Sequence, residues 1–163
     1  MTPRVLLGRT VAVWLLMMLI ESVHGVLRAM LLVPRVGDLP ARQIGVFTGS
    51  LLILAVTYLS LGWLRLDWPR LRFVAGIVWV LLTLAFEVVF GRFVLGYPWS
   101  RLAADYNLAR GGLMGLGLLV MLFAPSIAYA VATRGARSAG RRHIQPSVVH
   151  PSGPAGTLHR VDH

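Results

Sequence analysis

The feature that most constrains this chain is a set of four apolar segments, each long enough to cross a lipid bilayer as a helix. About 20 apolar residues span the hydrocarbon core of a membrane, and runs of this kind cover residues 11–33, 44–64, 73–95 and 108–132. The sequence therefore predicts an all-α membrane protein whose transmembrane domain covers residues 1–132.

The composition agrees with this class and excludes others. Hydrophobic residues make up 56% of the 163 positions and charged residues only 13%, which is too apolar for an ordinary soluble domain. Four helices use most of the chain and leave no room for a separate soluble domain. The absence of cysteine excludes disulfides, thiolate metal ligands and a cysteine nucleophile.

The charged residues indicate which side of the membrane each loop faces. All 16 basic residues are arginines, and more of them flank the predicted helices on the side of the chain termini than on the other side. The positive-inside rule then predicts a multi-pass protein of the bacterial inner membrane with both termini in the cytoplasm. The net charge of +10 favours contact with the lipid bilayer over nucleic acid, because no arginine-rich stretch lies on a soluble fold.

The composition changes after residue 132. Residues 133–163 are rich in Gly, Ser, Pro and Arg, which predicts a disordered basic cytoplasmic tail. Four of the five histidines of the chain lie in this tail, but their spacing matches no ordered metal motif. We therefore expect the tail to contact lipid headgroups rather than to bind a metal.

An internal duplication relates the two halves of the transmembrane domain. Residues 3–52 align with residues 69–118 without a gap. The rarer identities in this alignment are Pro3 with Pro69, Glu21 with Glu87, Gly25 with Gly91, Arg35 with Arg101, Gly45 with Gly111 and Gly49 with Gly115. Because an even number of crossings separates the copies, the repeat predicts two tandem parallel helical hairpins.

Two of the repeated pairs are glycines one helical turn apart. Gly45 and Gly49 lie in the second predicted helix, and Gly111 and Gly115 in the fourth. Small residues at this spacing let a neighbouring helix approach closely. We expect them to make helix-packing contacts within the bundle or with a second membrane protein subunit, as in a homo-oligomer.

Polar residues gather on one face of the first predicted helix. Glu21, His24 and Arg28 recur at i, i+3 and i+7, so they point to the same side. A charged group that faces lipid costs roughly 2.5–3.5 kcal/mol, so this face should point into the bundle. The candidate site is completed from the second copy and the loop after it by Glu87, Arg92, Asp105 and Arg110.

Three hypotheses account for the two membrane carboxyls. They could pair with Arg28, Arg92 or Arg110 and thereby hold the hairpins together or dock a partner, because a buried charge needs a counter-charge. Alternatively, Glu21 and Glu87 could form the proton or cation site of a small proton-coupled transporter of cationic or other small molecules.

The third hypothesis is a metal site. Glu21 and His24 have the i, i+3 spacing found in helical carboxylate di-metal sites, but the repeat supplies Phe90 where a second histidine is needed. We therefore expect no bound metal or cofactor. No motif of nucleophilic, zinc-dependent or nucleotide-dependent catalysis is present, so we name no catalytic residue.

The tandem layout, with an acid in the first helix of each pair and Phe86–Glu87 in the second copy, resembles the proteobacterial antimicrobial compound efflux family of proton-coupled transporters. Members of that family also carry Arg and His before the Phe-Glu pair, where this chain has Trp79 and Leu82. In the first copy, His24 follows Glu21 instead of preceding it. The resemblance implies a transport function and supports the second hypothesis.

Overall fold

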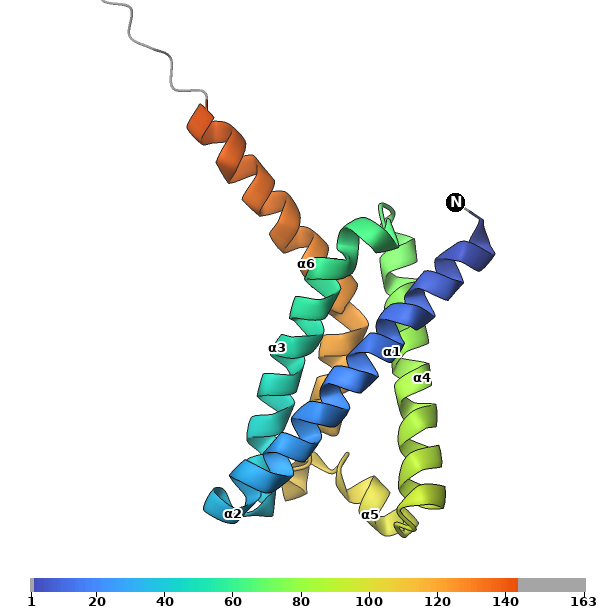
Figure 1. Cartoon of the computed structure of the whole chain (residues 1–163), viewed down its shortest axis with the longest axis vertical. Coiled ribbons are helices and arrows are strands. Elements are labelled where there is room, and N and C mark those ends of the chain that lie inside the picture. Colours follow the sequence, from blue (N-terminus) through green and yellow to red (C-terminus); the bar gives the residue numbers. More distant parts are fainter. Residues whose placement is uncertain (1, 144–163) are drawn as a thin grey trace, which may run out of the picture.

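The chain is helical throughout the part that the structure describes (Figure 1). A computed structural model describes residues 2–143, without the side chains of Arg110 and of residues 136–143. The long helices are α1 (Pro3–Leu27), α3 (Asp38–Leu64), α4 (Pro69–Val89) and α6 (Met114–His143). The shorter elements are η1 (Arg28–Leu32), α2 (Val33–Val36), η2 (Phe90–Val94), α5 (Trp99–Ala104) and η3 (Leu108–Arg110).

Four of these helical stretches are long and apolar enough to cross a membrane, which confirms the predicted all-α class. They are Pro3–Val36, Asp38–Leu64, Pro69–Val94 and Met114–Gly135. Large apolar side chains remain exposed along them, and Leu59 is 82% exposed. A surface of this kind is compatible with a multi-pass protein whose helices contact lipid.

Three helices begin earlier than the sequence pattern indicated. The expected starts were residues 11, 44 and 73, whereas α1 begins at Pro3, α3 at Asp38 and α4 at Pro69. Proline is favourable at the first helical position because its missing N–H would have no partner there, which explains Pro3 and Pro69. Gly37, with a φ of 85°, separates α2 from α3 and fixes where α3 begins.

The fourth helix differs from its prediction at both ends. It was expected over residues 108–132, but α6 begins only at Met114, because Gly111 has a φ of 79° and interrupts the helical path. The sequence pattern predicted a disordered tail from residue 133 onward, whereas in the structure α6 continues to His143. Arginine and alanine are good helix formers and are frequent in that segment. Residues 144–163 lie outside the described residues.

The first helix of each hairpin ends in a π-helical turn. In η1 the backbone N–H of Val33 donates to the carbonyl oxygen of Arg28. In η2 the backbone N–H of Leu95 donates to the carbonyl oxygen of Phe90 at 3.0 Å. Single π-turns widen a helix by one residue and often occur at functional positions. The two turns begin 62 residues apart, whereas the sequence repeat has an offset of 66, so the internal repeat stays a prediction.

The helices pack around a core near one end of the bundle. This end, which we call the N-terminal end, holds Pro3, Leu64 and Pro69, while α2 and α5 lie at the opposite end, the α5 end (Figure 1). Helix α3 packs on α6, with α1 against α3 and α4 against α6. The core is formed by buried side chains of all four long helices, among them Val13, Met17, Ile53, Trp79, Met121 and Ala124.

Two tryptophans join α1 to α4 within this core. Nε1 of Trp79, which is fully buried, donates to the carbonyl oxygen of Thr10 at 2.8 Å. Nε1 of Trp14 donates to the hydroxyl of Thr83 at 3.0 Å. From these contacts toward the α5 end the two helices diverge (Figure 1). The space between the diverging halves is where the candidate site lies.

Candidate functional site

A cavity of about 450 Å³ lies between α1, α3, α4 and α6 in the half of the bundle toward α5. This is the size range of small-molecule sites, which are mostly apolar with a few polar groups. The titratable and charged residues that line it are Glu21, His24, Arg28, Arg42, Glu87 and Asp105. The structure therefore gathers most of the sequence-predicted site residues around one cavity.

The polar face of α1 points toward α3, and the glycines of α3 provide the space for it. A Cβ added at Gly49 would lie 2.8 Å from Oε2 of Glu21, and one at Gly45 would lie 2.6 Å from Cδ of Arg28. Both glycines therefore contact charged side chains of the neighbouring helix. The neighbours of both glycines are side chains that line a cavity, and the helix-packing role of the glycine pairs stays a prediction.

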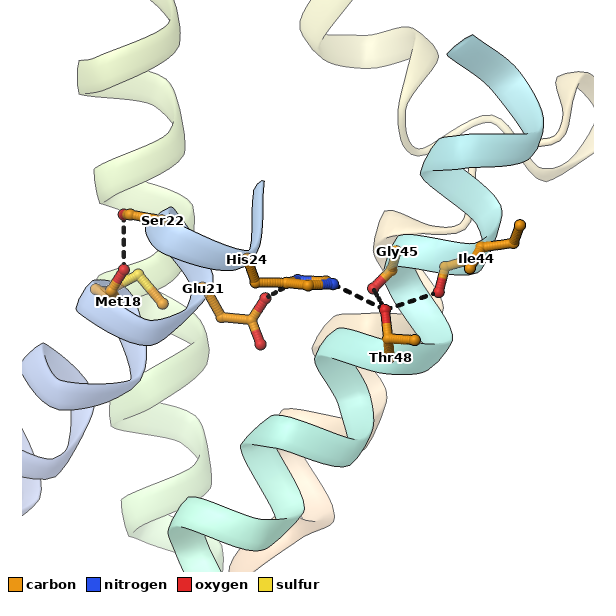
Figure 2. Close-up of polar contacts among 7 residues, drawn as sticks. All are labelled: Met18, Glu21, Ser22, His24, Ile44, Gly45 and Thr48. Carbon is orange, nitrogen blue, oxygen red and sulfur yellow. Dashed lines mark hydrogen bonds and ion pairs between the residues drawn. The ribbon is translucent and has the colours of Figure 1, made fainter. Parts of the chain in front are cut away.

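Glu21, His24 and Thr48 form a hydrogen-bonded chain between α1 and α3 (Figure 2). Nδ1 of His24 lies 3.1 Å from Oε2 of Glu21, and Nε2 of His24 lies 2.8 Å from the Thr48 hydroxyl. The Thr48 hydroxyl is also 3.0 Å from the carbonyl oxygen of Ile44, one turn earlier in α3. About a quarter or less of each side chain in the Glu21–His24 pair is exposed, 24% and 21% respectively.

The direction of each hydrogen bond in this chain depends on which ring nitrogen of His24 carries a proton. The Thr48 hydroxyl has one hydrogen, and it lies within reach of both the Ile44 carbonyl oxygen and His24 Nε2. His24 Nδ1 can donate to an ionised Glu21 or accept from a protonated one. The chain therefore connects a carboxyl to an imidazole that can either donate or accept a proton.

Glu87 binds a residue that the sequence did not single out. Its Oε2 accepts a hydrogen bond from the hydroxyl of Tyr106, which follows α5. Burial raises the pKa of Tyr106 above its usual value, and the hydrogen bond to Glu87 and the charges of Glu87 and Asp105 raise it further. Tyr106 therefore stays protonated at physiological pH and acts as the donor in this contact.

Arg42 links the two hairpins at the α5 end. Its Nη1 lies 2.5 Å from Oδ1 of Asp105, and its Nε lies 3.3 Å from Oδ2 of Asp38. Asp105 was a predicted site residue, and its partner is this arginine of α3. Sequence reasoning missed Arg42 because residues 42 and 105 are brought together only by the packing of α3 beside the loop after α5.

The remaining predicted residues lie at the margin of the cavity or away from it. The Arg92 guanidinium is 5.9 Å from the centre of the Trp99 ring, a cation–π contact. Arg110 belongs to η3, and its side chain lies outside what the structure describes. Gly111 precedes α6, and a Cβ at Gly115 would meet nothing within 4 Å, so the structure places no helix contact at Gly115.

The structure also shows which pairings the carboxyls make. Among the side chains described for residues 2–143, neither Glu21 nor Glu87 forms an ion pair with an arginine; their partners are His24 and Tyr106. Over the same residues, no three His, Asp or Glu side chains lie close enough together to hold a metal ion.

Comparisons with protein-family models, with curated proteins and with solved structures found no match to this chain.

Proposed function

We propose that the protein is a small proton-coupled carrier that binds a small molecule in the cavity between its four long helices. The observation that carries this proposal is that Glu21 and Glu87, from different helices, line one cavity and that neither is paired with a described arginine. A carboxyl at membrane depth without a permanent counter-charge is free to bind and release a proton.

The partners of the two carboxyls support proton exchange. His24 and Tyr106 can each donate an N–H or O–H to a carboxyl, and the contact between His24 and Glu21 is short enough for proton exchange between them. The second oxygen of Glu21, Oε1, is buried and has no hydrogen-bond partner among the described residues. This leaves Glu21 with an acceptor that a proton or a ligand can use.

A second candidate function is a structural or partner-docking role for the polar cluster. The link from Arg42 to Asp105 favours it, because this ion pair joins the two hairpins. Partly buried ion pairs hold elements in register, although their net contribution to stability is small.

We place the protein in a bacterial inner membrane with both termini in the cytoplasm, as two tandem hairpins in a lipid bilayer. The support for this orientation is the larger number of arginines near helix ends on the side of the termini. The support for the hairpin repeat is the sequence alignment, together with the proline start and the π-turn end that α1 and α4 share.

The two functions predict opposite effects of Glu21→Gln and Glu87→Gln in the full-length protein. For a carrier, we expect thermal midpoints in detergent that are unchanged or raised, because functional charges are commonly held at a cost in stability. Proteoliposomes that contain the wild-type protein and a pH-sensitive dye should then show proton movement when leucine or isoamylamine is added. Each of the two substitutions should abolish this proton movement. Asp105→Asn is the control, since it breaks the Arg42 pair and should lower the midpoint.

A structural role predicts the reverse for the carboxyls. In that case Glu21→Gln and Glu87→Gln should destabilise the protein by about 3–5 kcal/mol, as the loss of a buried charge pair does, and vesicles with the wild-type protein should show no probe-dependent proton movement. These two results together would overturn the carrier proposal and support the structural role.

A further inference from the structure

The charges around the cavity do not all find partners within the described part of the chain. Glu21 is in contact with His24, and Arg42 is paired with Asp38 and Asp105. This leaves Arg28, on α1, and Glu87, on α4, as a cation and an acid that line one cavity without an opposite charge beside them.

Arg28 is positioned to meet an anion. Its side chain passes over Gly45, where only a glycine leaves room for it, and the guanidinium continues along the cavity. Its Nη1 is buried and has no hydrogen-bond partner among the described residues. A buried guanidinium N–H without an acceptor is costly, and a carboxylate or a phosphate oxygen is the acceptor that satisfies it best.

Glu87 lies on the other side of the same cavity. Among the described residues, only one of its two carboxyl oxygens has a hydrogen-bond partner, the Tyr106 hydroxyl. A hydroxyl donor leaves the carboxylate charge uncompensated, so a cationic group of a ligand would find here the counter-charge that it needs.

We infer that the ligand of this cavity is a zwitterion, with a carboxylate or phosphate on Arg28 and a protonated amine on Glu87. This inference rests on the proposed binding function and names the chemical class of the ligand. A simple cation would leave Arg28 without a partner, and a simple anion would leave an ionised Glu87 without one. A molecule that carries both charges satisfies both sides of the cavity.

The rest of the lining adds an apolar part to this ligand. Phe86 and Phe90 line the cavity with their rings stacked at 5.4 Å, and Met18 and Met121 lie among the lining residues. Aromatic and methionine side chains bind apolar groups of varied shape. Two sources of such a molecule are a free amphiphilic amino acid and a phospholipid headgroup that carries an amine.

Matched probes test this inference on the full-length protein in a mild detergent. Leucine has both charges, 4-methylpentanoate lacks the amine, and isoamylamine lacks the carboxylate. Lysophosphatidylethanolamine and lysophosphatidic acid form the corresponding lipid pair. If the ligand is a free zwitterion, we expect a Kd for leucine at least tenfold lower than for 4-methylpentanoate and isoamylamine. If the ligand is a lipid, we expect a Kd for lysophosphatidylethanolamine at least tenfold lower than for lysophosphatidic acid.

The variants assign each charge to its residue. With Arg28→Gln, the zwitterion should no longer bind with a lower Kd than isoamylamine. With Glu87→Gln, it should no longer bind with a lower Kd than 4-methylpentanoate or lysophosphatidic acid. Arg28→Lys keeps the charge and should retain a preference for the zwitterion, which guards against a simple folding defect. Arg35→Gln is the matched control, because Arg35 is exposed on α2 and donates to the carbonyl oxygen of Leu31.

The outcomes separate this inference from the proposed function. Preference for leucine identifies a free zwitterion as the ligand, and preference for lysophosphatidylethanolamine identifies a lipid. If a singly charged probe binds as tightly as its zwitterion, the inference is overturned, while proton movement with that probe would leave the carrier function standing. If a zwitterion is preferred but moves no protons, the inference stands and the carrier function fails.

Discussion

At the scale of single residues, the glycines of α3 show how a small side chain can serve a charged one. Gly45 and Gly49 provide room for Arg28 and Glu21 of the neighbouring helix. Without that room the charged side chains would be displaced toward the apolar outer surface of the bundle. The same residue type at Gly115 has no neighbour within 4 Å of an added Cβ. The role of each of these glycines therefore depends on whether a side chain of a neighbouring helix lies against it.

This contrast gives a matched pair of substitutions. Gly49→Ala should destabilise the protein by about 1–3 kcal/mol, because the new methyl group would lie 2.8 Å from Glu21 Oε2 and force that carboxyl to move. Gly115→Ala should be neutral or stabilise by up to about 1 kcal/mol, since alanine favours the helix. Unfolding in mixed detergent micelles measures both, and equal effects of the two substitutions would contradict the contact.

Tyr106 makes stability depend on pH in the alkaline range. Its pKa in the folded protein is raised, while in the unfolded chain it stays near 10. Above that pH the unfolded state releases a proton that the folded state keeps, so the free energy of unfolding falls as the pH rises. We expect the stability advantage of wild type over Tyr106→Phe at pH 8 to shrink above about pH 10. A constant difference in thermal midpoint from pH 8 to 11 would show that Tyr106 is not buried against Glu87.

At the scale of elements, helix α4 approaches α6 most closely at Gly76. Among the described glycines, an added Cβ would come nearest to the backbone of another helix at this position. A Cβ at Gly76 would lie 2.0 Å from the carbonyl oxygen of Leu122. A side-chain methyl group cannot be accommodated against backbone at that distance without moving a helix. The sequence analysis did not identify Gly76, because the helix-packing residues were chosen by repeated glycine spacing and Gly76 has no glycine one turn away.

Gly76→Ala should therefore be the most destabilising glycine substitution in the bundle. We expect a loss of about 3 kcal/mol, since overpacking here moves α4 away from α6. Gly8→Ala in α1 is the control: nothing lies within 4 Å of its added Cβ, so the helix gains from the better propensity of alanine. Unfolding free energies in mixed micelles compare the two, and a tolerated Gly76→Ala would mean that the helices are farther apart.

At the scale of the whole molecule, the splayed geometry of α1 and α4 creates the site. The tryptophan contacts of Trp14 and Trp79 hold the two helices together near the N-terminal end, and their divergence leaves a cavity toward α5. The core therefore lies toward the N-terminal end and the cavity toward α5, and Ile53 and Met121 border both. This division separates stabilising contacts from groups that remain available for a ligand.

The proposed orientation can be tested because the chain contains no cysteine. Thr2→Cys lies before α1, and Ser100→Cys lies in α5 at the other end of the bundle. In intact cells, we expect a membrane-impermeant maleimide to label Ser100→Cys and to label Thr2→Cys only after the membrane is permeabilised. The opposite pattern would invert the topology and place the cavity toward the cytoplasmic side.

The class of the fold and the polar face of α1 follow from the amino-acid sequence without any tertiary information. Four apolar segments of bilayer length dictate helices, because backbone groups in a membrane must bond within their own segment. Helical periodicity placed Glu21, His24 and Arg28 on one face, and the structure has them lining one cavity. Segment boundaries were less well determined, since the start at Pro3 and the late start of α6 depend on single proline and glycine conformations.

Which groups meet depends on how the helices pack against one another. The pairs Glu21 with Gly49, His24 with Thr48, Glu87 with Tyr106 and Arg42 with Asp105 each join separate elements. Periodicity gives the face of a helix, but it contains no information on the rotation and tilt of the neighbouring helix that supplies the partner. Those are set by packing at Gly76 and Trp79, and among the described side chains they place His24 beside Glu21 and Tyr106 beside Glu87.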